Sequence, residues 1–309
     1  MPGQRIISLL PAATEIVCAL GLRDNLVGRS HECDYPESVK TLPVCTEANI
    51  EAGLSSGEID TCIKNILGDA LPVYTLKRDV IRQLAPDMVI TQAQCDVCAV
   101  SLPQVEQALE DDTGRVTRIL SLSPATLTGI FDNISEVAAA LGVQESGASL
   151  LEQLHERLDI IRHKLKFISD RPLVACVEWL DPFMISGNWI PGLVQIAGGL
   201  PILAESGKHS RGVQWTDIQA ADPDIIILMP CGFGIAQTMK ELNLLLQQPG
   251  FAELKAIKGN RLYITDGNRY FNRPGPAIVD SVEILAEIIN PKQFIFGYEG
   301  AGWIRFEAS

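Results

Sequence analysis

The chain has 309 residues, is 47% hydrophobic and 6% aromatic, and carries a formal net charge of −13. This length is typical of a globular protein with two domains of about 100–200 residues each. The acidic balance argues against nucleic acid and anionic membranes as partners, because their phosphates attract basic surfaces.

The N-terminus predicts a short strand over residues 5–10, followed by a turn and a helix. We expect Thr14 to be the N-cap of that helix and Gly21 to close it. Glu15 interrupts the apolar residues here, so we recognise no segment of signal-peptide length. As written, the sequence predicts a cytoplasmic protein, or a periplasmic one if a leader has been removed. No later run approaches the ~20 apolar residues of a membrane helix.

The two halves of the chain repeat one pattern. Leu84-Ala-Pro-Asp-Met-Val-Ile and Ala221-Asp-Pro-Asp-Ile-Ile-Ile match in form, and each ends a helix before an apolar strand. Short apolar strands that alternate with helices indicate parallel sheets covered on both faces, and hence an α/β fold. The expected elements are strands over residues 26–28, 88–91, 173–177 and 225–229, and helices over residues 80–85, 190–199 and 215–221.

A long amphipathic pattern lies between the halves. Apolar residues fall on one stripe from Leu150 to Ile168, and charged residues occupy the other positions. A helix over residues 149–169 spans ~30 Å at 1.5 Å per residue. It is either an ordinary helix of a single larger domain or a bridge between two lobes, and the repeat favours the bridge. The predicted division is an N-terminal lobe over 1–125, a helical linker over 126–170 and a C-terminal lobe over 171–309.

Several motifs occur in a characteristic order over residues 5–290. The motifs are Ser8-Leu-Leu-Pro-Ala-Ala-Thr-Glu15, Val27-Gly28, Cys33-Asp-Tyr-Pro36, the two Pro-Asp phrases, Ser186-Gly187, Gly198-Gly199 and Asp266-Gly-Asn-Arg-Tyr-Phe-Asn-Arg-Pro-Gly-Pro276. With these motifs in this order, the chain resembles the cobalamin-binding proteins of the helical-backbone metal-receptor class, the substrate-binding components of cobalamin and ferric-siderophore ABC transporters.

The resemblance implies a class III substrate-binding fold, with two parallel-sheet α/β lobes joined by a long backbone helix. It implies that cobalamin or a related corrinoid binds in the cleft between the lobes, either in a transporter receptor with an ABC permease as partner or in a cytoplasmic carrier. Sheet topology also places ligands beyond the carboxyl ends of parallel strands. We expect a monomer. We also expect no enzymatic activity, since we find no Walker loop and no His-Glu-x-x-His motif.

Four candidate metal ligands follow two of the predicted strands. His31 and Cys33 follow the second strand, and Cys95 and Cys98 follow the strand at residues 88–91. If both strands belong to one parallel sheet, these side chains converge at one edge. They have the types and number of a tetrahedral zinc site, or His31 or a thiolate is an axial ligand of a corrinoid's cobalt. Alternatively, the cysteines are small side chains that pack a turn.

The remaining ligand-binding candidates are aromatic and polar residues on predicted loops. Aromatic rings can cover the apolar faces of a macrocycle, and arginines can meet its amides, a phosphate or carboxylates. Each of these side chains can instead be core or solvated surface. The candidates are Glu32, Asp34, Tyr35, Gln92, Trp179, Phe183, Trp189, Trp215, Arg269, Tyr270 and Arg273, together with His31. The alternatives to a corrinoid are haem, a ferric siderophore or zinc in the same cleft, or a metal-dependent enzyme that uses the Cys/His cluster.

Overall fold

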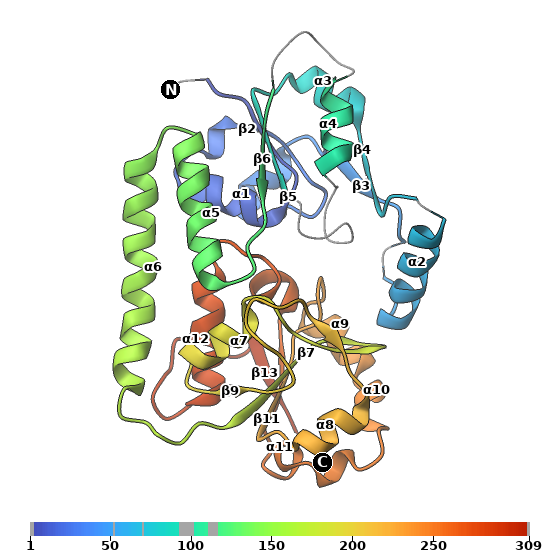
Figure 1. Cartoon of the computed structure of the whole chain (residues 1–309), viewed down its shortest axis with the longest axis vertical. Helices are drawn as coiled ribbons and strands as arrows, with labels where there is room; N and C mark the ends of the chain where they lie inside the picture. Colours follow the sequence, from blue (N-terminus) through green and yellow to red (C-terminus); the bar gives the residue numbers. More distant parts are fainter. Residues whose placement is uncertain (1–2, 52, 70, 93–101, 111–116, 308–309) are drawn as a thin grey trace. The chain divides into compact units, whose positions relative to one another are not determined.

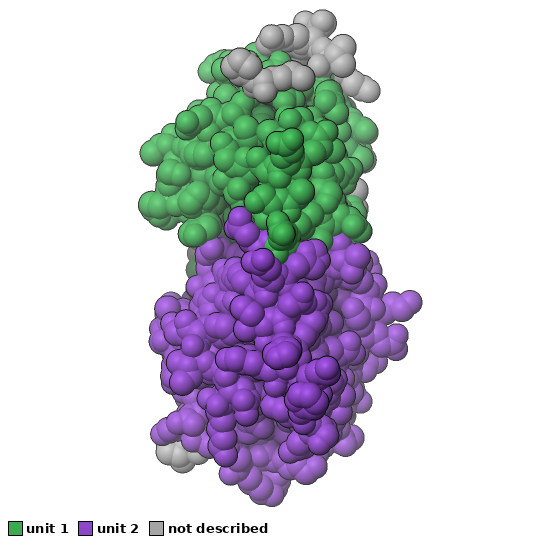
Figure 2. All heavy atoms as spheres, turned by 90° about the vertical axis from the view of Figure 1, so that its left-hand side faces the viewer, with its two compact units in different colours: residues 1–54, 58–124, 129–152 green, residues 55–57, 125–128, 153–309 purple. Residues whose placement is uncertain are grey.

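The computed structural model describes residues 3–51, 53–69, 71–92, 102–110 and 117–307. The chain forms two compact units, which Figure 2 shows in two colours. Each unit has a sheet of its own. Unit 1 comprises residues 1–54, 58–124 and 129–152, and unit 2 comprises residues 55–57, 125–128 and 153–309.

Unit 1 contains a four-stranded parallel sheet with the strand order β2-β1-β5-β6 (Figure 1). A small antiparallel sheet pairs β3 with β4. The strands are β1 (Ile6–Ser8), β2 (Leu26–Arg29), β3 (Thr46–Ala48), β4 (Tyr74–Leu76), β5 (Met88–Gln92) and β6 (Arg118–Leu122). The helices that lie wholly or mainly in this unit are α1 (Pro11–Ala19), α2 (Ser56–Gly68), α3 (Arg78–Leu84), α4 (Leu102–Glu110) and α5 (Leu127–Ala140).

The centre of this sheet is buried because its strands are apolar on both faces. Ile6 and Ile7 of β1 are fully buried, and so is Ile90 of β5. In the parallel ladder, Ile7 pairs with Val89. This burial matches the continuous apolar runs in the sequence and confirms the predicted parallel sheet of the first half.

Helix α1 begins at Pro11, three residues before the predicted cap. The prediction that Thr14 is the N-cap is therefore wrong. Thr14 lies in the first part of the helix, is fully buried, and donates its hydroxyl hydrogen to Ser8 Oγ at 2.8 Å. Proline suits the first helical position because it has no N–H to leave unpaired and its φ is already helical.

Unit 2 contains a seven-stranded sheet with the strand order β10-β8-β7-β11-β12-β13, and β9 pairs with β7 beside that path. The strands are β7 (Leu173–Leu180), β8 (Phe183–Ile185), β9 (Leu200–Pro201), β10 (Arg211–Gly212), β11 (Ile225–Leu228), β12 (Leu262–Thr265) and β13 (Trp303–Phe306). The helices are α7 (Ile190–Ile196), α8 (Trp215–Ala221), α9 (Ile235–Glu241), α10 (Asn243–Leu246), α11 (Lys255–Lys258) and α12 (Ile278–Ile289).

This second sheet is parallel only at its centre. β7, β11 and β12 pair in parallel, which confirms the prediction from their apolar sequences. β8 and β10 on one side and β13 on the other are antiparallel, and the sequence analysis did not predict them. The antiparallel strands continue the sheet on both sides of the parallel centre.

The repeated Pro-Asp phrase makes the same joint in both units. Asp87 follows α3, and its Oδ2 accepts the backbone N–H of Arg5 at 2.8 Å, at the entrance to β1. Asp224 follows α8, and its Oδ2 accepts the backbone N–H of Leu173 at 2.8 Å, at the start of β7. The residue before each proline has a positive φ, 42° in unit 1 and 40° in unit 2, which ends the helix. We call this arrangement the Pro-Asp joint.

The long helix, α6 (Gln144–Leu165), contributes residues to both units. It begins five residues earlier than predicted and ends four residues earlier. Arg157, in its unit 2 portion, donates to Glu283 of α12 from Nε at 2.9 Å and also forms an ion pair with Asp280. Among the described residues, no helix combines the length and the apolar character that a membrane-spanning segment needs.

Candidate functional site

Two predicted ligand-binding segments of unit 1 begin at carboxyl ends of parallel strands. β2 ends at Arg29 and leads directly into residues 30–35, and β5 ends at half-buried Gln92. β1 lies between these two strands in the sheet. Cys95 and Cys98, the two other predicted metal ligands, lie outside the described residues.

His31 is held on one side by Thr46 of β3. The backbone N–H of His31 donates to Thr46 Oγ1 at 3.0 Å, and Nδ1 lies 2.7 Å from the same oxygen. The ring of Tyr74 lies 5.4 Å from the imidazole, centroid to centroid. Burial lowers the pKa of His31, and the positive charges of Lys77 and Arg29 lower it further. The imidazole is therefore neutral at pH 7, and because Thr46 holds Nδ1, Nε2 is the nitrogen suited to a metal ion.

Cys33 has a different environment from His31. Its thiol is fully buried, and Sγ lies 3.9 Å from the carbonyl oxygen of Ser8, as in an ordinary core cysteine. Among the described residues, no three His, Cys, Asp or Glu side chains gather as metal ligands do. The predicted four-ligand zinc set needs Cys95 and Cys98, so it stays a prediction.

The other candidates of unit 1 lie nearer the surface. Glu32 is exposed, and its Oε1 accepts a hydrogen bond from the hydroxyl of Tyr74 at 3.4 Å. Asp34 is half-buried, and Tyr35 is 46% exposed. The structure thus gathers Glu32 with His31 around Tyr74, which the sequence analysis did not single out.

In unit 2, the loops at the carboxyl ends of the parallel strands also carry aromatic residues. Half-buried Trp179 lies near the end of β7 and contacts Phe233, with ring centroids 5.4 Å apart. Phe233 lies in the loop over residues 229–234, which follows β11. Residues 266–273 follow β12 at the corresponding position. Since β7, β11 and β12 are parallel neighbours, these three segments leave the same edge of the sheet.

Trp189 and Trp215 are buried parts of unit 2 rather than residues of open loops. Trp189 is 8% exposed, and its Nε1–H donates to the carbonyl oxygen of Phe271 at 2.9 Å. Trp215 is 7% exposed, and its Nε1–H donates to the carbonyl oxygen of Pro249 at 2.7 Å. Trp189 precedes α7 and Trp215 begins α8, in agreement with the helices predicted from residues 190 and 215, and the structure adds that both indoles are buried. Their contact with a ligand stays a prediction.

The polar candidates after β12 are organised by a π-helical turn, Gly267–Phe271. The guanidinium of Arg269 lies 5.4 Å from the ring centre of Tyr270, a cation–π contact. Arg273 is only 4% exposed and donates to Asn268 Oδ1 at 3.1 Å. Arg273 is therefore tied into the loop and is not a solvated surface arginine.

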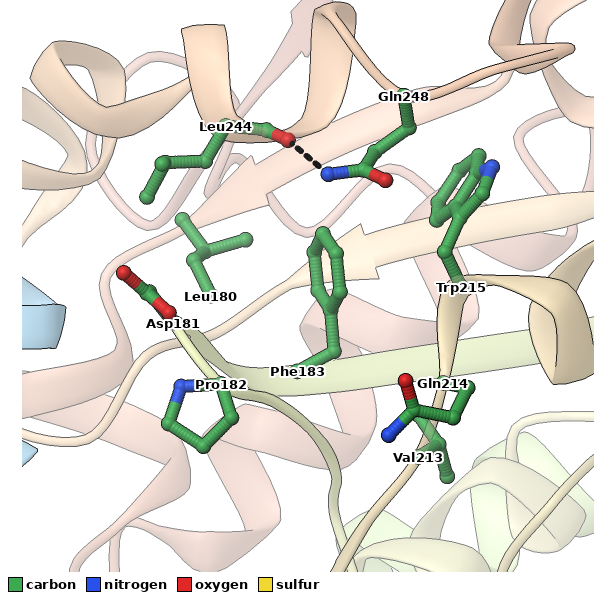
Figure 3. A pocket seen from close by; sticks show the side chains of 9 residues that line it. All are labelled: Leu180, Asp181, Pro182, Phe183, Val213, Gln214, Trp215, Leu244 and Gln248. Atoms are coloured by element: carbon green, nitrogen blue, oxygen red, sulfur yellow. Dashed lines mark hydrogen bonds between the residues drawn. The ribbon is translucent and has the colours of Figure 1, made fainter.

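A cavity of about 310 Å³ lies within unit 2, where β7 turns into β8 (Figure 3). It brings two predicted residues together, Phe183 and Trp215, whose ring centroids are 5.7 Å apart. Figure 3 shows Trp215 on one side of Phe183 and Asp181 on the other. The lining consists of Leu180, Asp181, Pro182, Phe183, Val213, Gln214, Trp215, Leu244 and Gln248.

Several residues of these sites were missed in the sequence. Thr46 and Tyr74 belong to short strands that pair with each other, and no local pattern connects them with His31. Gln248 of the cavity follows a helix of four residues, too short to show a periodicity. Phe233 had a usable signal, since it directly follows the apolar run over residues 225–229. The expectation that the loops of both halves line one cleft stays a prediction.

The sequence is similar to known substrate-binding proteins along nearly its whole length. It is 23% identical over 296 residues to an uncharacterised ABC transporter substrate-binding lipoprotein of Bacillus subtilis, covering 94% of this chain and 81% of that protein. It is 25% identical over 285 residues to the vitamin B12-binding protein of Vibrio cholerae, covering 91% of this chain and 87% of that protein.

Solved structures show the same fold. The periplasmic haem-binding protein of Pseudomonas aeruginosa superposes with a TM-score of 0.69 at 20% identity and covers 94% of each chain. The periplasmic vitamin B12-binding protein of Vibrio cholerae superposes with a TM-score of 0.65 at 22% identity, over 94% of this chain and 98% of that one. The sequence model of the family described as periplasmic binding protein matches residues 6–268. The chain therefore belongs to the periplasmic binding protein family, as a substrate-binding protein of the helical-backbone metal-receptor class with a class III fold.

Proposed function

We propose that this protein binds cobalamin or a related corrinoid and delivers it to the permease of an ABC transporter. The observation that carries this proposal is the similarity to a vitamin B12-binding protein over nearly the full length of both chains. The structure supports it with aromatic residues at the carboxyl ends of the unit 2 strands, where parallel sheets hold ligands. The protein is thus a carrier of a small molecule rather than an enzyme.

The proposed role also bears on location. The cytoplasmic expectation finds no support, because the similar proteins are described as a lipoprotein and as periplasmic binding proteins. A substrate-binding protein meets its ligand outside the cytoplasm, before the permease moves that ligand inward. We therefore propose that this protein acts outside the cytoplasmic membrane.

Haem is the second candidate ligand. It is favoured by the solved haem-binding structure of the same fold and by the neutral imidazole of His31. A neutral imidazole binds iron as well as cobalt, so His31 alone does not separate the two chelates. A ferric siderophore, zinc and a metal-dependent enzyme remain alternatives, but no described contact favours any of them.

Calorimetric titration tests the proposal directly. We expect the wild-type protein to bind cyanocobalamin with a Kd of about 1 μM or less, roughly −8 kcal/mol. If neither cyanocobalamin nor hydroxocobalamin binds measurably, the proposal is wrong. If haem binds more tightly than either cobalamin, haem becomes the proposed ligand.

The same titration isolates His31. Water on the cobalt of hydroxocobalamin can be replaced by imidazole, whereas cyanide is replaced much less readily. His31→Ala should therefore weaken the binding of hydroxocobalamin more than the binding of cyanocobalamin. The matched control is His163→Ala, which removes an exposed histidine of α6. Equal effects of His31→Ala on both cobalamins remove His31 as a metal ligand and leave the corrinoid proposal intact.

A further inference from the structure

The cavity of unit 2 has an unusual balance of hydrogen-bonding groups. Among its lining residues there is one carboxylate, Asp181, and there are two amides, Gln214 and Gln248, but no lysine, arginine or histidine. Within the described part of the chain, no ion pair involves Asp181. The cavity therefore carries a negative charge that no lining group balances.

The amides of the cavity already have partners that fix their orientation. Gln248 donates from Nε2 to the carbonyl oxygen of Leu244 at 2.9 Å, so its Oε1 remains an acceptor (Figure 3). The Gln214 side chain accepts the backbone N–H of Asp217 in the capping box of α8, so its amino group remains a donor. With Asp181, the lining thus offers carboxylate and amide oxygens as acceptors and amide N–H groups as donors.

This arrangement complements a primary carboxamide. A carboxamide has an amino group that donates and a carbonyl oxygen that accepts, whereas an ionised carboxylate only accepts. A carboxylate in this cavity meets the charge of Asp181 and finds no cation among the lining residues. Asp181 is exposed, so water weakens this repulsion without removing it. Phe183 and Trp215, whose rings contact each other, supply an apolar part of the lining for the stem of either group.

The size of the cavity limits what it can hold. A volume of about 310 Å³ is at the lower end of ligand pockets and is too small for a whole tetrapyrrole macrocycle. It is sufficient for one peripheral side chain of such a ligand. Corrinoids carry acetamide and propionamide side chains around the ring, whereas haem carries two propionates.

We propose that this cavity is a specificity subsite that accepts an amidated side chain of the ligand and rejects a carboxylated one, with Asp181 as the residue that discriminates. The inference rests on the proposed function and deepens it, since it identifies a physical reason for preferring a corrinoid to haem. The specificity comes from an unfavourable interaction with the wrong ligand as much as from contacts with the right one.

The test compares cyanocobalamin with its monocarboxylic acids, in which one propionamide has been hydrolysed to a carboxylate. By titration of the wild-type protein at pH 7, we expect at least one monoacid to bind about threefold more weakly than the amide. Asp181→Asn should reduce this ratio strongly, because it removes the repelling charge. Asp170→Asn, which removes an exposed carboxylate outside the cavity, should leave the ratio unchanged.

A second variant keeps the inference falsifiable if Asp181→Asn misfolds. Gln248→Glu adds a carboxylate to the lining and should increase the discrimination against the monoacid. Equal binding of the amide and all monoacids by the wild-type protein overturns the inference, and so does a ratio that neither variant changes. Those results leave the corrinoid function standing, whereas absence of any corrinoid binding removes the proposed function and this subsite together.

Discussion

At the scale of single residues, His31 shows how a short loop gains a defined chemical state. The residue follows a strand of the parallel sheet, but its imidazole is positioned by Thr46, which is fifteen residues away in the chain. Burial and nearby positive charges together disfavour the protonated ring. A histidine that stays neutral around pH 7 is suited to bind a metal through nitrogen, and it also couples protein stability to pH.

The pH dependence of stability has a definite sign for this histidine. The pKa of His31 in the folded protein lies below its ordinary value of 6.5, so below that pH the unfolded state binds the proton more readily. The contribution of neutral His31 to the free energy of unfolding is complete above about pH 6.5 and is lost as the pH falls towards the folded-state pKa. Urea unfolding should therefore show that the free energy of unfolding falls more between pH 7.5 and pH 5.5 in the wild-type protein than in His31→Gln. Equal losses contradict the lowered pKa.

At the scale of elements, the Pro-Asp joint explains why the two halves of the sequence share a phrase. In each unit the aspartate lies between a helix and a central strand, and its carboxylate binds the backbone N–H where the neighbouring strand begins. Proline ends the helix, and the carboxylate satisfies a backbone donor that lies before the regular ladder. The joint thus links two elements that are far apart in the sequence.

Loss of the joint should destabilise the unit that contains it. Asp224→Ala leaves the N–H of Leu173 without its charged acceptor, so we expect the free energy of unfolding to fall by about 1–3 kcal/mol. All four tryptophans lie in unit 2, so their fluorescence reports the unfolding of that unit. Asp224→Asn keeps an acceptor oxygen, so its free energy of unfolding should fall by less. If the alanine and asparagine variants are equally stable, the hydrogen bond is not the reason for the repeated aspartate.

At the scale of the whole molecule, each of the two units has a main sheet and a hydrophobic cluster packed on it. The core of unit 1 is built around β1 and β5, and the core of unit 2 around β7, β11 and β12. Parallel central strands in both units leave their connecting loops free to bind a ligand without disturbing either core. Ligand binding should therefore add to the stability of a fold that already exists.

This expectation gives a prediction for the intact protein. A ligand that binds only the folded state raises the free energy of unfolding by about 2.7 kcal/mol at a concentration of 100 times its Kd. Cyanocobalamin at that concentration, with the Kd taken from calorimetry, should produce this increase in urea unfolding at 25 °C. An unchanged unfolding curve despite calorimetric binding indicates that the unfolded chain binds the ligand equally well.

Much of the architecture can be predicted from local sequence. The helix predicted over residues 215–221 has those bounds in the structure, and the strand predicted over residues 225–229 ends one residue earlier. Prolines, glycines and continuous apolar runs act over a few residues, so they mark elements wherever the chain folds. The class III fold was implied by the family resemblance that the ordered motifs carry. Thr14 was misassigned because a preceding proline competed with it for the start of the helix.

The sequence by itself determined the alternation of elements, the parallel centres of both sheets and the family. Only the tertiary structure decided which side chains are buried and which strands pair at the sheet edges. Trp189 and Trp215 lie at the starts of predicted helices, but the sequence does not show that their indole N–H groups bind carbonyl oxygens 82 and 34 residues away. His31 likewise depends on Thr46, and β13 on its pairing with β12. The physical reason is that burial, pairing and pKa depend on groups brought close by folding, and local sequence does not specify those groups.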